Sequence, residues 1–130
     1  MTVGQRGVGD AEGVLDGVEA CAEVVPGIVR CDAALSHVFA ILGKRWNGII
    51  VGALSYGAAS FSQLARGVTG ISDSVLSERL SGLAAAGIVT RVVDSGPPVS
   101  VTYALSPAGQ ALVPALDELR LWAEQHLTVV

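Results

Sequence analysis

The feature that most constrains this chain is a change of hydrophobic period along its second half. Residues 73–86 are expected to form a helix, because their leucines recur at the spacing of one helical face: Leu76, Leu80 and Leu83. The period then becomes two in residues 89–93 and 99–105, two β-rich runs that flank a turn-forming segment. A helical period returns over residues 107–127, where Ser106 is expected to cap the helix and Pro107 lies in its first turn. The sequence therefore predicts a helix, a β-hairpin and a helix in direct succession.

A shorter helix with its own start signal lies ahead of this pattern. Ser62 is expected to cap a helix that ends near Val68, and Thr69-Gly70-Ile71 forms a tight connection to Ser72. Ser72 is expected to cap the helix over 73–86, whose outer face carries polar or small residues: Ser74, Glu78, Ser81, Gly82 and Ala85. This layout is typical of a helix-turn-helix unit, at about residues 62–86, with a wing at about 89–105.

Further helices are expected towards the N-terminus. Asp32 can cap a helix that ends at Gly43, and another helix is expected from about Lys44 or Arg45 to Leu54. Ser60-Phe61 leaves room for one short strand. Residues 1–30 are expected to be a flexible acidic arm with a helix at 11–25, in whose apolar stripe Cys21 packs.

The order of these elements predicts an α+β fold that is mainly helical. It is a winged helix-turn-helix domain over residues 31–130, with N- and C-terminal dimerisation helices, the second at about 107–127. The stripe of this last helix comprises Leu112, Leu116, Leu119, Ala123 and Leu127. Together with Val14 and Val18 of the arm, it exposes more apolar area than one small domain can cover, so we expect a homodimer.

The overall charge of the chain argues against nucleic acid, but the charge of its middle does not. The formal net charge is −4, whereas DNA is held mainly by Lys and Arg. Residues 44–91 hold five cations against two acids, a balance of +3, while the arm at 1–30 holds five acids against two arginines. A weakly basic face is therefore expected on the folded domain.

The distribution of apolar residues bears on where the protein works. No apolar run approaches the roughly 18 residues of a membrane span. The N-terminal residues carry Asp10 and Glu12 where a secretory signal needs an unbroken apolar stretch. We therefore expect a cytoplasmic protein without a membrane partner.

The reactive residues do not predict catalysis or metal binding. Cys31 and His37 lie six residues apart on or beside one helix, so they project about 240° apart and cannot form a nucleophile–base pair. Paired acids and a glycine-rich phosphate loop are missing from the sequence. Cys21 and Cys31 lack the spacing of a metal-binding pair. The sequence thus predicts no enzyme, no metal site and no cofactor.

Several stretches of the chain match, in order, the motifs of one known family. They are Cys31 with Leu42-Gly43-Lys44-Arg45-Trp46, Phe61-Ser62-Gln63-Leu64, Gly70-Ile71-Ser72, Val75-Leu76-Ser77-Glu78-Arg79-Leu80, Leu83-Ala84-Ala85-Ala86-Gly87-Ile88-Val89 and Tyr103-Ala104-Leu105-Ser106-Pro107-Ala108-Gly109. Over residues 31–127 the chain resembles the HxlR-type regulators of bacteria, a group related to MarR. The resemblance implies a dimeric DNA-binding repressor or activator whose first and last helices form the dimer interface. It also implies a response to electrophiles or oxidants through a thiol near Cys31.

The chain departs from the family pattern at three places. Asp73 and Ser74 stand where family members often carry Gln or Lys, and Ser100 stands where Arg or Lys is frequent. Cys31 is followed by Asp32 rather than by Pro. Since the first two departures remove donors and cations from the expected DNA face, they favour weak or unusual DNA affinity.

The candidate DNA contacts come from the helix-turn-helix, the wing and the segment before Trp46. They are Lys44, Arg45, Ser62, Gln63, Ser72, Asp73, Ser74, Ser77, Glu78, Arg79, Arg91, Ser95 and Ser100. Arg79 could reach a phosphate or a guanine edge, or could instead form an internal salt bridge. Glu78 could accept from a cytosine amino group or be a solvated carboxylate. Lys44 and Arg45 could contact the DNA backbone or pair with the acidic arm.

Three residues are candidates for sensing a signal. Cys31 precedes a helix, whose N-terminus favours the reactive thiolate, whereas the charge of Asp32 opposes it, so the residue is either a sensor or inert. Trp46 and Trp122 are either core residues or the walls of a small-molecule effector site in the dimer.

The function favoured by the sequence is that of a homodimeric repressor. It would bind double-stranded operator DNA and respond to a small molecule or to a redox or electrophile signal. The alternative is a winged-helix protein-interaction module that has lost DNA binding. The net charge of −4 and the charge-poor wing favour this alternative.

Overall fold

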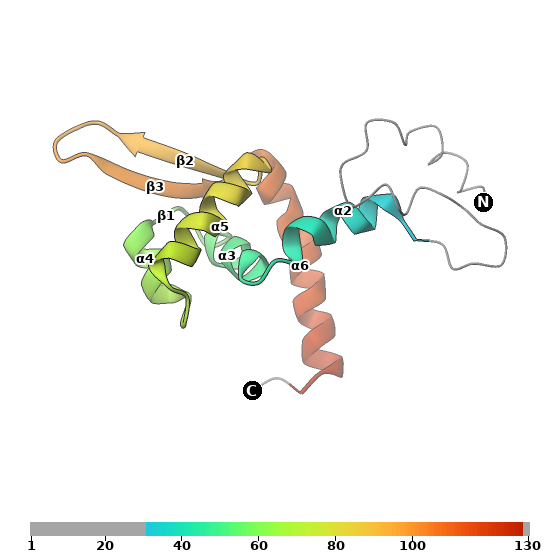
Figure 1. Ribbon diagram of the computed structural model, residues 1–130. Helices are drawn as coiled ribbons and strands as arrows, with labels where there is room; N and C mark the ends of the chain where they lie inside the picture. The colour runs from blue at the N-terminus through green and yellow to red at the C-terminus, as the bar shows by residue number, and fades with distance from the viewer. Residues whose placement is uncertain (1–30, 129–130) are drawn as a thin grey trace. The chain divides into compact units, whose positions relative to one another are not determined.

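The computed structural model of the chain describes residues 31–128 (Figure 1). Its elements are α2 (Ala33–Leu42), α3 (Asn47–Leu54), β1 (Ala59–Ser60), α4 (Phe61–Gly67), α5 (Asp73–Ala85), β2 (Val89–Asp94), β3 (Ser100–Leu105) and α6 (Pro107–His126). The chain divides between Lys44 and Arg45 into two compact units, with α2 in the first and the other elements in the second. The predicted arm at 1–30, its helix at 11–25 and the packing of Cys21 lie outside the described residues.

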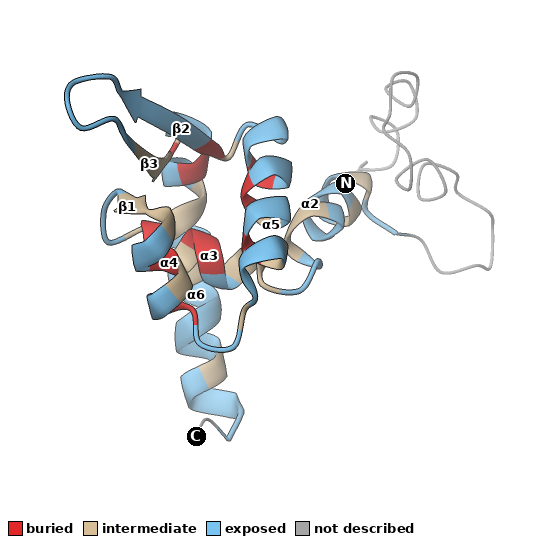
Figure 2. Ribbon diagram, turned by 60° about the vertical axis from the view of Figure 1, so that its left-hand side comes forward, coloured by how far each residue is buried: buried red, intermediate tan, exposed pale blue. Residues whose placement is uncertain are grey.

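The second unit is built around one small apolar core. The helix α3 packs against α4, α6 and β3, while α5 packs against β2. The buried apolar side chains are Ile50, Val51, Leu54, Leu64, Val68, Leu76, Leu80, Leu83, Val89 and Leu105. Figure 2 shows these positions in red on α3, α4, α5 and the bases of the two long strands. In the part of the chain that the structure describes, no helix is long and apolar enough to cross a membrane.

The three strands form one antiparallel sheet in the order β1-β3-β2. Val89 pairs with Leu105, and Asp94 pairs with Ser100 at the far end of the hairpin. The two-residue strand β1 pairs on the other side of β3, where Ala59 lies opposite Tyr103. The structure is therefore an α+β fold that is mainly helical, as the sequence predicts, and the hairpin lies where the wing is expected.

Three of the predicted helix starts are confirmed. Asp32 caps α2 by accepting a hydrogen bond from the backbone N–H of Leu35 at 2.9 Å. Ser72 caps α5 through Val75 N–H at 3.2 Å, and Ser106 caps α6 through Gly109 N–H at 3.1 Å. A short side-chain oxygen at each of these positions satisfies a backbone donor that the helix itself leaves unpaired.

Two predicted helix starts are wrong. The helix α4 begins at Phe61 and is capped by Ser60, not by Ser62, because Ser60 and Gln63 form a reciprocal capping box. The strand before it is accordingly Ala59–Ser60 rather than Ser60-Phe61. The helix α3 begins at Asn47, because Trp46 adopts a left-handed backbone with φ 82° and interrupts the helical path. Lys44 and Arg45 therefore precede the helix instead of opening it.

Candidate nucleic-acid interface

The helix α5 presents one packed face and one open face. Leu76, Leu80 and Leu83 are buried in the core, and the opposite side is exposed along a stripe that we call the open face: Ser74, Ser77, Glu78, Ser81, Gly82 and Ala85. All of these side chains except that of Glu78 are short or absent. An exposed helical face of small, polar residues can approach a macromolecular surface closely, as the recognition helix of a helix-turn-helix does in the DNA major groove.

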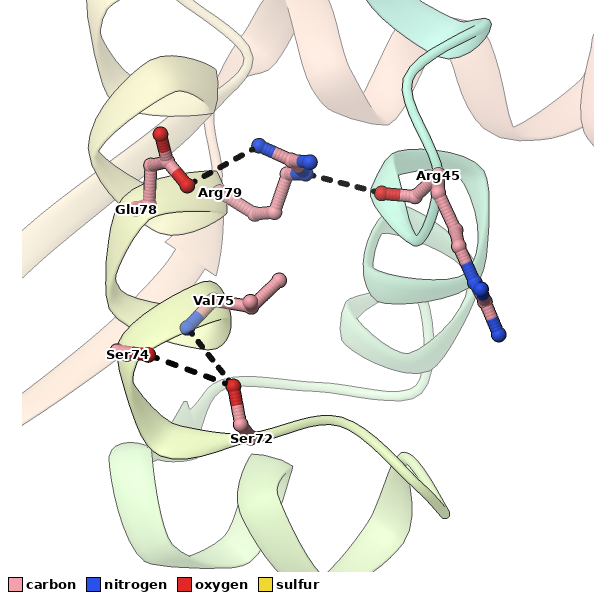
Figure 3. Close-up of polar contacts among 6 residues, drawn as sticks. All are labelled: Arg45, Ser72, Ser74, Val75, Glu78 and Arg79. Atoms are coloured by element: carbon pink, nitrogen blue, oxygen red, sulfur yellow. Dashed lines mark hydrogen bonds and ion pairs between the residues drawn. The ribbon is translucent and has the colours of Figure 1, made fainter.

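The first turn of α5 is rich in hydroxyl groups. The Ser72 Oγ accepts a hydrogen bond from Val75 N–H and lies 3.4 Å from the Ser74 Oγ (Figure 3). Asp73, the first residue of the helix, is exposed. The positive end of the helix dipole lies at this turn, which favours phosphate, whereas the carboxylate of Asp73 opposes an anion here.

Two residues with positive φ lie near each other at the turn between α4 and α5: Gly70 within the turn and Trp46, which precedes α3. Gly70 has φ 94°, and a Cβ placed on it would lie 3.5 Å from the Cη2 atom of Trp46. Trp46 itself has φ 82°, and its ring lies under the guanidinium of Arg45, whose Cζ is 4.8 Å from the ring centroid. The Trp46 ring thus supports the turn that sets the orientation of α5 and contacts Arg45 in addition.

Gln63 and Ser62 of α4 lie in different situations. The Gln63 side chain accepts a hydrogen bond from Ser60 N–H at 2.8 Å, so it is engaged in capping the helix. Ser62 is exposed, and its Oγ lies 3.3 Å from the Ser60 Oγ. Of these two predicted contacts, Gln63 therefore has a structural task that the sequence analysis did not assign to it.

Arg79 is held inside the protein rather than extended towards solvent. Its Nε donates to the backbone carbonyl of Arg45 at 3.0 Å, and its Nη1 lies 3.5 Å from the Glu78 carboxylate (Figure 3). Only 22% of the Arg79 side chain is exposed, against 72% for Glu78. Arg79 thus links α5 to the segment before α3, and its ion pair is formed with Glu78.

Within residues 44–91, the cations that remain exposed are spread over three segments. Lys44 and Arg45 are exposed in the turn before α3, and Arg91 is exposed on β2, opposite Tyr103 of β3. Arg66 is also exposed, in the last turn of α4. Arg66 belongs to the basic segment 44–91 but is not among the DNA contacts predicted from the sequence. Its place in the first helix of a helix-turn-helix, the helix that crosses the DNA backbone, was the signal that could have found it.

The wing carries more apolar than charged surface. Val92, Val93 and Val99 are 46%, 50% and 68% exposed. Ser95 and Ser100 are exposed as predicted candidates, and the turn between the strands contains a cis peptide bond at Pro97-Pro98. The Asp94 carboxylate accepts a hydrogen bond from Gly96 N–H at 3.1 Å. Asp94 is the one charged residue in residues 92–101, so the tip of the hairpin carries no cation.

The candidate sensing residues belong to different segments of the chain. Cys31 is disulfide-bonded, and the sequence contains one other cysteine, Cys21, which lies outside the described residues. The Trp46 ring lies between the guanidinium of Arg45 and the turn at Gly70. Trp122 on α6 is 52% exposed, with its ring 5.7 Å from that of His126. Within residues 31–128, His, Cys, Asp and Glu side chains form no group that could hold a metal ion.

Comparison with known proteins gives a consistent result. Residues 41–130 match the model of a family described as HxlR-like helix-turn-helix. The HTH-type transcriptional regulator YodB of Bacillus subtilis is 38% identical over 91 residues, which cover 70% of this chain and 81% of YodB. The reduced form of YodB has a solved structure that matches with a TM-score of 0.68 and 36% identity, over 76% of this chain and 96% of that one. The redox regulator HypR in its oxidised form matches with a TM-score of 0.68 and 28% identity, over 74% of this chain and 99% of HypR.

Proposed function

The chain belongs to the HxlR-like helix-turn-helix family, and we propose that it is a homodimeric repressor of transcription. Its relatives YodB and YvaP of Bacillus subtilis are named transcriptional regulators and not enzymes. Each subunit places the open face of α5 in the major groove of one half-site of its operator, with half-sites about one helical turn apart. The observation that carries this proposal is that face, exposed and lined with small residues on a helix whose other side is buried. We propose that the protein binds this operator in the cytoplasm.

Titration of the DNA upstream of its own gene, followed by fluorescence anisotropy, tests the proposal. Ser74→Asp adds a carboxylate to the open face in the first turn of α5, and we expect it to weaken binding by about tenfold or more, because the charge faces phosphates. Gln110→Asp adds the same charge on the exposed surface of α6 and serves as the matched control. Equal weakening by both variants, or by neither, would argue against α5 as the DNA-reading helix.

The dimer is proposed to form through α6. Within this helix only Gly109 is buried, and Leu119, Trp122 and Leu127 are each more than half exposed. An apolar helix face of this kind is usually covered by a partner. A second copy is the occupant we propose, since an operator with two half-sites requires two recognition helices in a fixed spacing.

The signal is proposed to be oxidation or electrophilic modification of Cys31. Two observations support this: Cys31 is disulfide-bonded in a chain with one other cysteine, and HypR, a redox regulator, has the same fold. Formation of the disulfide takes two protons and two electrons from two thiols and gives them to an oxidant such as diamide. The disulfide constrains the segment before α2. We propose that this constraint changes the spacing between the two recognition helices of the dimer.

Cysteine variants separate a sensing role from a structural one. We expect diamide to change the DNA affinity of the wild type and to have no effect on Cys31→Ser, with a matching shift on a non-reducing gel. Cys21→Ser distinguishes a bridge between the two cysteines, which it abolishes, from an adduct on Cys31 alone, which it leaves in place. An unchanged affinity of the oxidised wild type would refute the proposed sensing role.

The second candidate function is a protein-interaction module without DNA binding. The exposed valines of the wing favour it, together with the net charge of −4. Wild-type protein that fails to shift any promoter fragment in an electrophoretic assay, while remaining a folded dimer, would support this candidate over the repressor.

A further inference from the structure

Glu78 stands at the centre of the open face of α5. At 100° per residue, Ser74, Ser81 and Ala85 share its side of the helix. These neighbours have one side-chain carbon each, whereas Glu78 has three and is 72% exposed. Its carboxylate therefore projects furthest from the face that we propose to enter the major groove. A carboxylate in this position either only repels the DNA phosphates or also accepts a hydrogen bond from a base.

Arg79 limits where that carboxylate can lie. The Nε of Arg79 is fixed on the backbone carbonyl of Arg45 at 3.0 Å, and its Nη1 contacts the Glu78 Oε1 at 3.5 Å (Figure 3). Reaching a phosphate would require the guanidinium to give up these two contacts, and only 22% of the Arg79 side chain is exposed. Its positive charge next to Glu78 also offsets part of the repulsion between the carboxylate and the DNA backbone.

The chemistry of the groove then selects a base for Glu78. An ionised carboxylate only accepts hydrogen bonds, so the guanine edge and the thymine O4, which offer acceptors, are excluded. Adenine presents its amino donor next to the acceptor N7, whereas cytosine presents an amino donor without a neighbouring acceptor. A carboxylate is therefore matched best by cytosine.

We propose that Glu78 is a specificity-determining residue that reads the amino group of one cytosine in each half-site, and that Arg79 is its positioning residue. This inference rests on the proposed DNA-binding function and adds the identity of one base to it. It also gives Arg79 a positioning role, whereas the sequence left a direct DNA contact and an internal salt bridge as alternatives.

Selection of binding sites from a pool of random duplex DNA tests the inference without knowledge of the operator. The wild type is expected to select cytosine at one position of each half-site and to lose about tenfold in affinity when that base is replaced. Glu78→Ala should lose the preference at that position alone. Glu78→Gln should shift it to adenine, because an amide both donates and accepts and so matches the adenine edge.

Two further variants control for charge and for folding. Asp73→Asn removes the same charge from the first turn of α5 and should leave the base preference at that position unchanged. Arg79→Gln should relax the preference at that position, whereas a merely structural role would weaken all sequences by the same factor. Arg79→Lys, which keeps the charge but not the fork, provides a second variant if Arg79→Gln does not fold.

The outcomes of the selection are distinguishable. If Glu78→Ala and Glu78→Gln select the same sites as the wild type, the inference about Glu78 is overturned and the proposed DNA binding stands. If the wild type enriches no sequence at all, both the proposed function and this inference fail.

Discussion

At the scale of single residues, the turn of the helix-turn-helix depends on a strained tryptophan and a glycine that meet. Trp46 has φ 82°, a conformation that costs a bulky residue about 1–3 kcal/mol. The guanidinium of Arg45 lies over its ring, a Cβ built on Gly70 would lie 3.5 Å from its Cη2 atom, and Arg79 donates to the carbonyl of the preceding residue, Arg45. The strain is thus balanced by contacts with the turn and the recognition helix.

Gly70→Ala is expected to destabilise the protein by about 1–2 kcal/mol, because φ 94° is unfavourable for any residue with a Cβ. The new methyl group itself would fit, at an ordinary 3.5 Å from Trp46. Gly82→Ala is the matched control: a Cβ there meets nothing within 4 Å inside α5, so it should stabilise by up to about 1 kcal/mol. Urea denaturation of both variants measures the difference, and a stabilising Gly70→Ala would contradict the prediction.

The sequence could not predict the conformation of Trp46. The chain from Lys44 to Leu54 reads as continuous helix, since nothing in Lys44, Arg45 or Trp46 disfavours helix locally. The interruption comes from contacts with Gly70 and Arg79, which are distant along the chain. Local patterns carry no record of such contacts, and for the same reason the tether that holds Arg79 was not foreseen.

At the scale of elements, the start of α4 illustrates how a choice between two caps is made. Ser60 and Ser62 are both good N-cap residues, and sequence reasoning chose Ser62. The structure uses Ser60, because Gln63 then lies at the third helical position and its side chain can return to Ser60 N–H. Only the reciprocal pair distinguishes the two serines, and this pairing is visible in the sequence as Ser-x-x-Gln.

Ser60→Ala is therefore expected to cost about 1 kcal/mol in unfolding free energy, the usual loss for an N-cap oxygen. Ser62→Ala, two residues further on, should stay within about 0.5 kcal/mol, as an exposed surface change does. Paired urea melts followed by circular dichroism provide the measurement. A larger loss for Ser62→Ala than for Ser60→Ala would mean that the helix begins where the sequence analysis placed it.

Elements with a strong period were predicted more accurately. The stripe of α5, the β-hairpin and α6 with its cap Ser106 lie where the sequence places them, because each alternation is enforced by burial against a neighbouring element. The contacts of the candidate site could not be predicted from periodicity. Periodicity identifies which residues face outwards, but whether an outward residue such as Gln63 or Arg79 is already engaged depends on its hydrogen-bond partners.

At the scale of the whole molecule, the exposed stripe on α6 predicts a dimer that one charge can break. Leu119 is 53% exposed on the stripe, and Leu121 is 42% exposed on the opposite side of the helix. Leu119→Glu should give monomers at micromolar concentration, because it would place a charge in the apolar interface. Leu121→Glu should remain dimeric. Sedimentation velocity distinguishes the two, and dimers in both cases would exclude this face as the interface.

The balance of charge over the molecule makes a prediction about DNA binding that is independent of the operator sequence. Four exposed cations lie in residues 44–91: Lys44, Arg45, Arg66 and Arg91. If all of them neutralised phosphates in a dimer, about eight counterions would be released, and the slope of log K against log salt would be about −7. Acids near the same surfaces, Asp73 and Asp94 among them, oppose full neutralisation, so we expect a slope shallower than −7.

Arg66→Gln and Arg91→Gln identify which cations contribute to that slope. Each substitution removes one charge per subunit, so a residue that contacts phosphate should make the slope shallower by about 2 units per dimer. Arg120→Gln is the control, because this arginine lies on α6 in an ion pair with Glu124 at 3.1 Å. Anisotropy titrations at several salt concentrations give the slopes. If Arg66→Gln leaves the slope unchanged while Arg91→Gln reduces it, the wing carries the backbone contact and α4 does not, whereas a wild-type slope steeper than about −7 would require cations beyond these four.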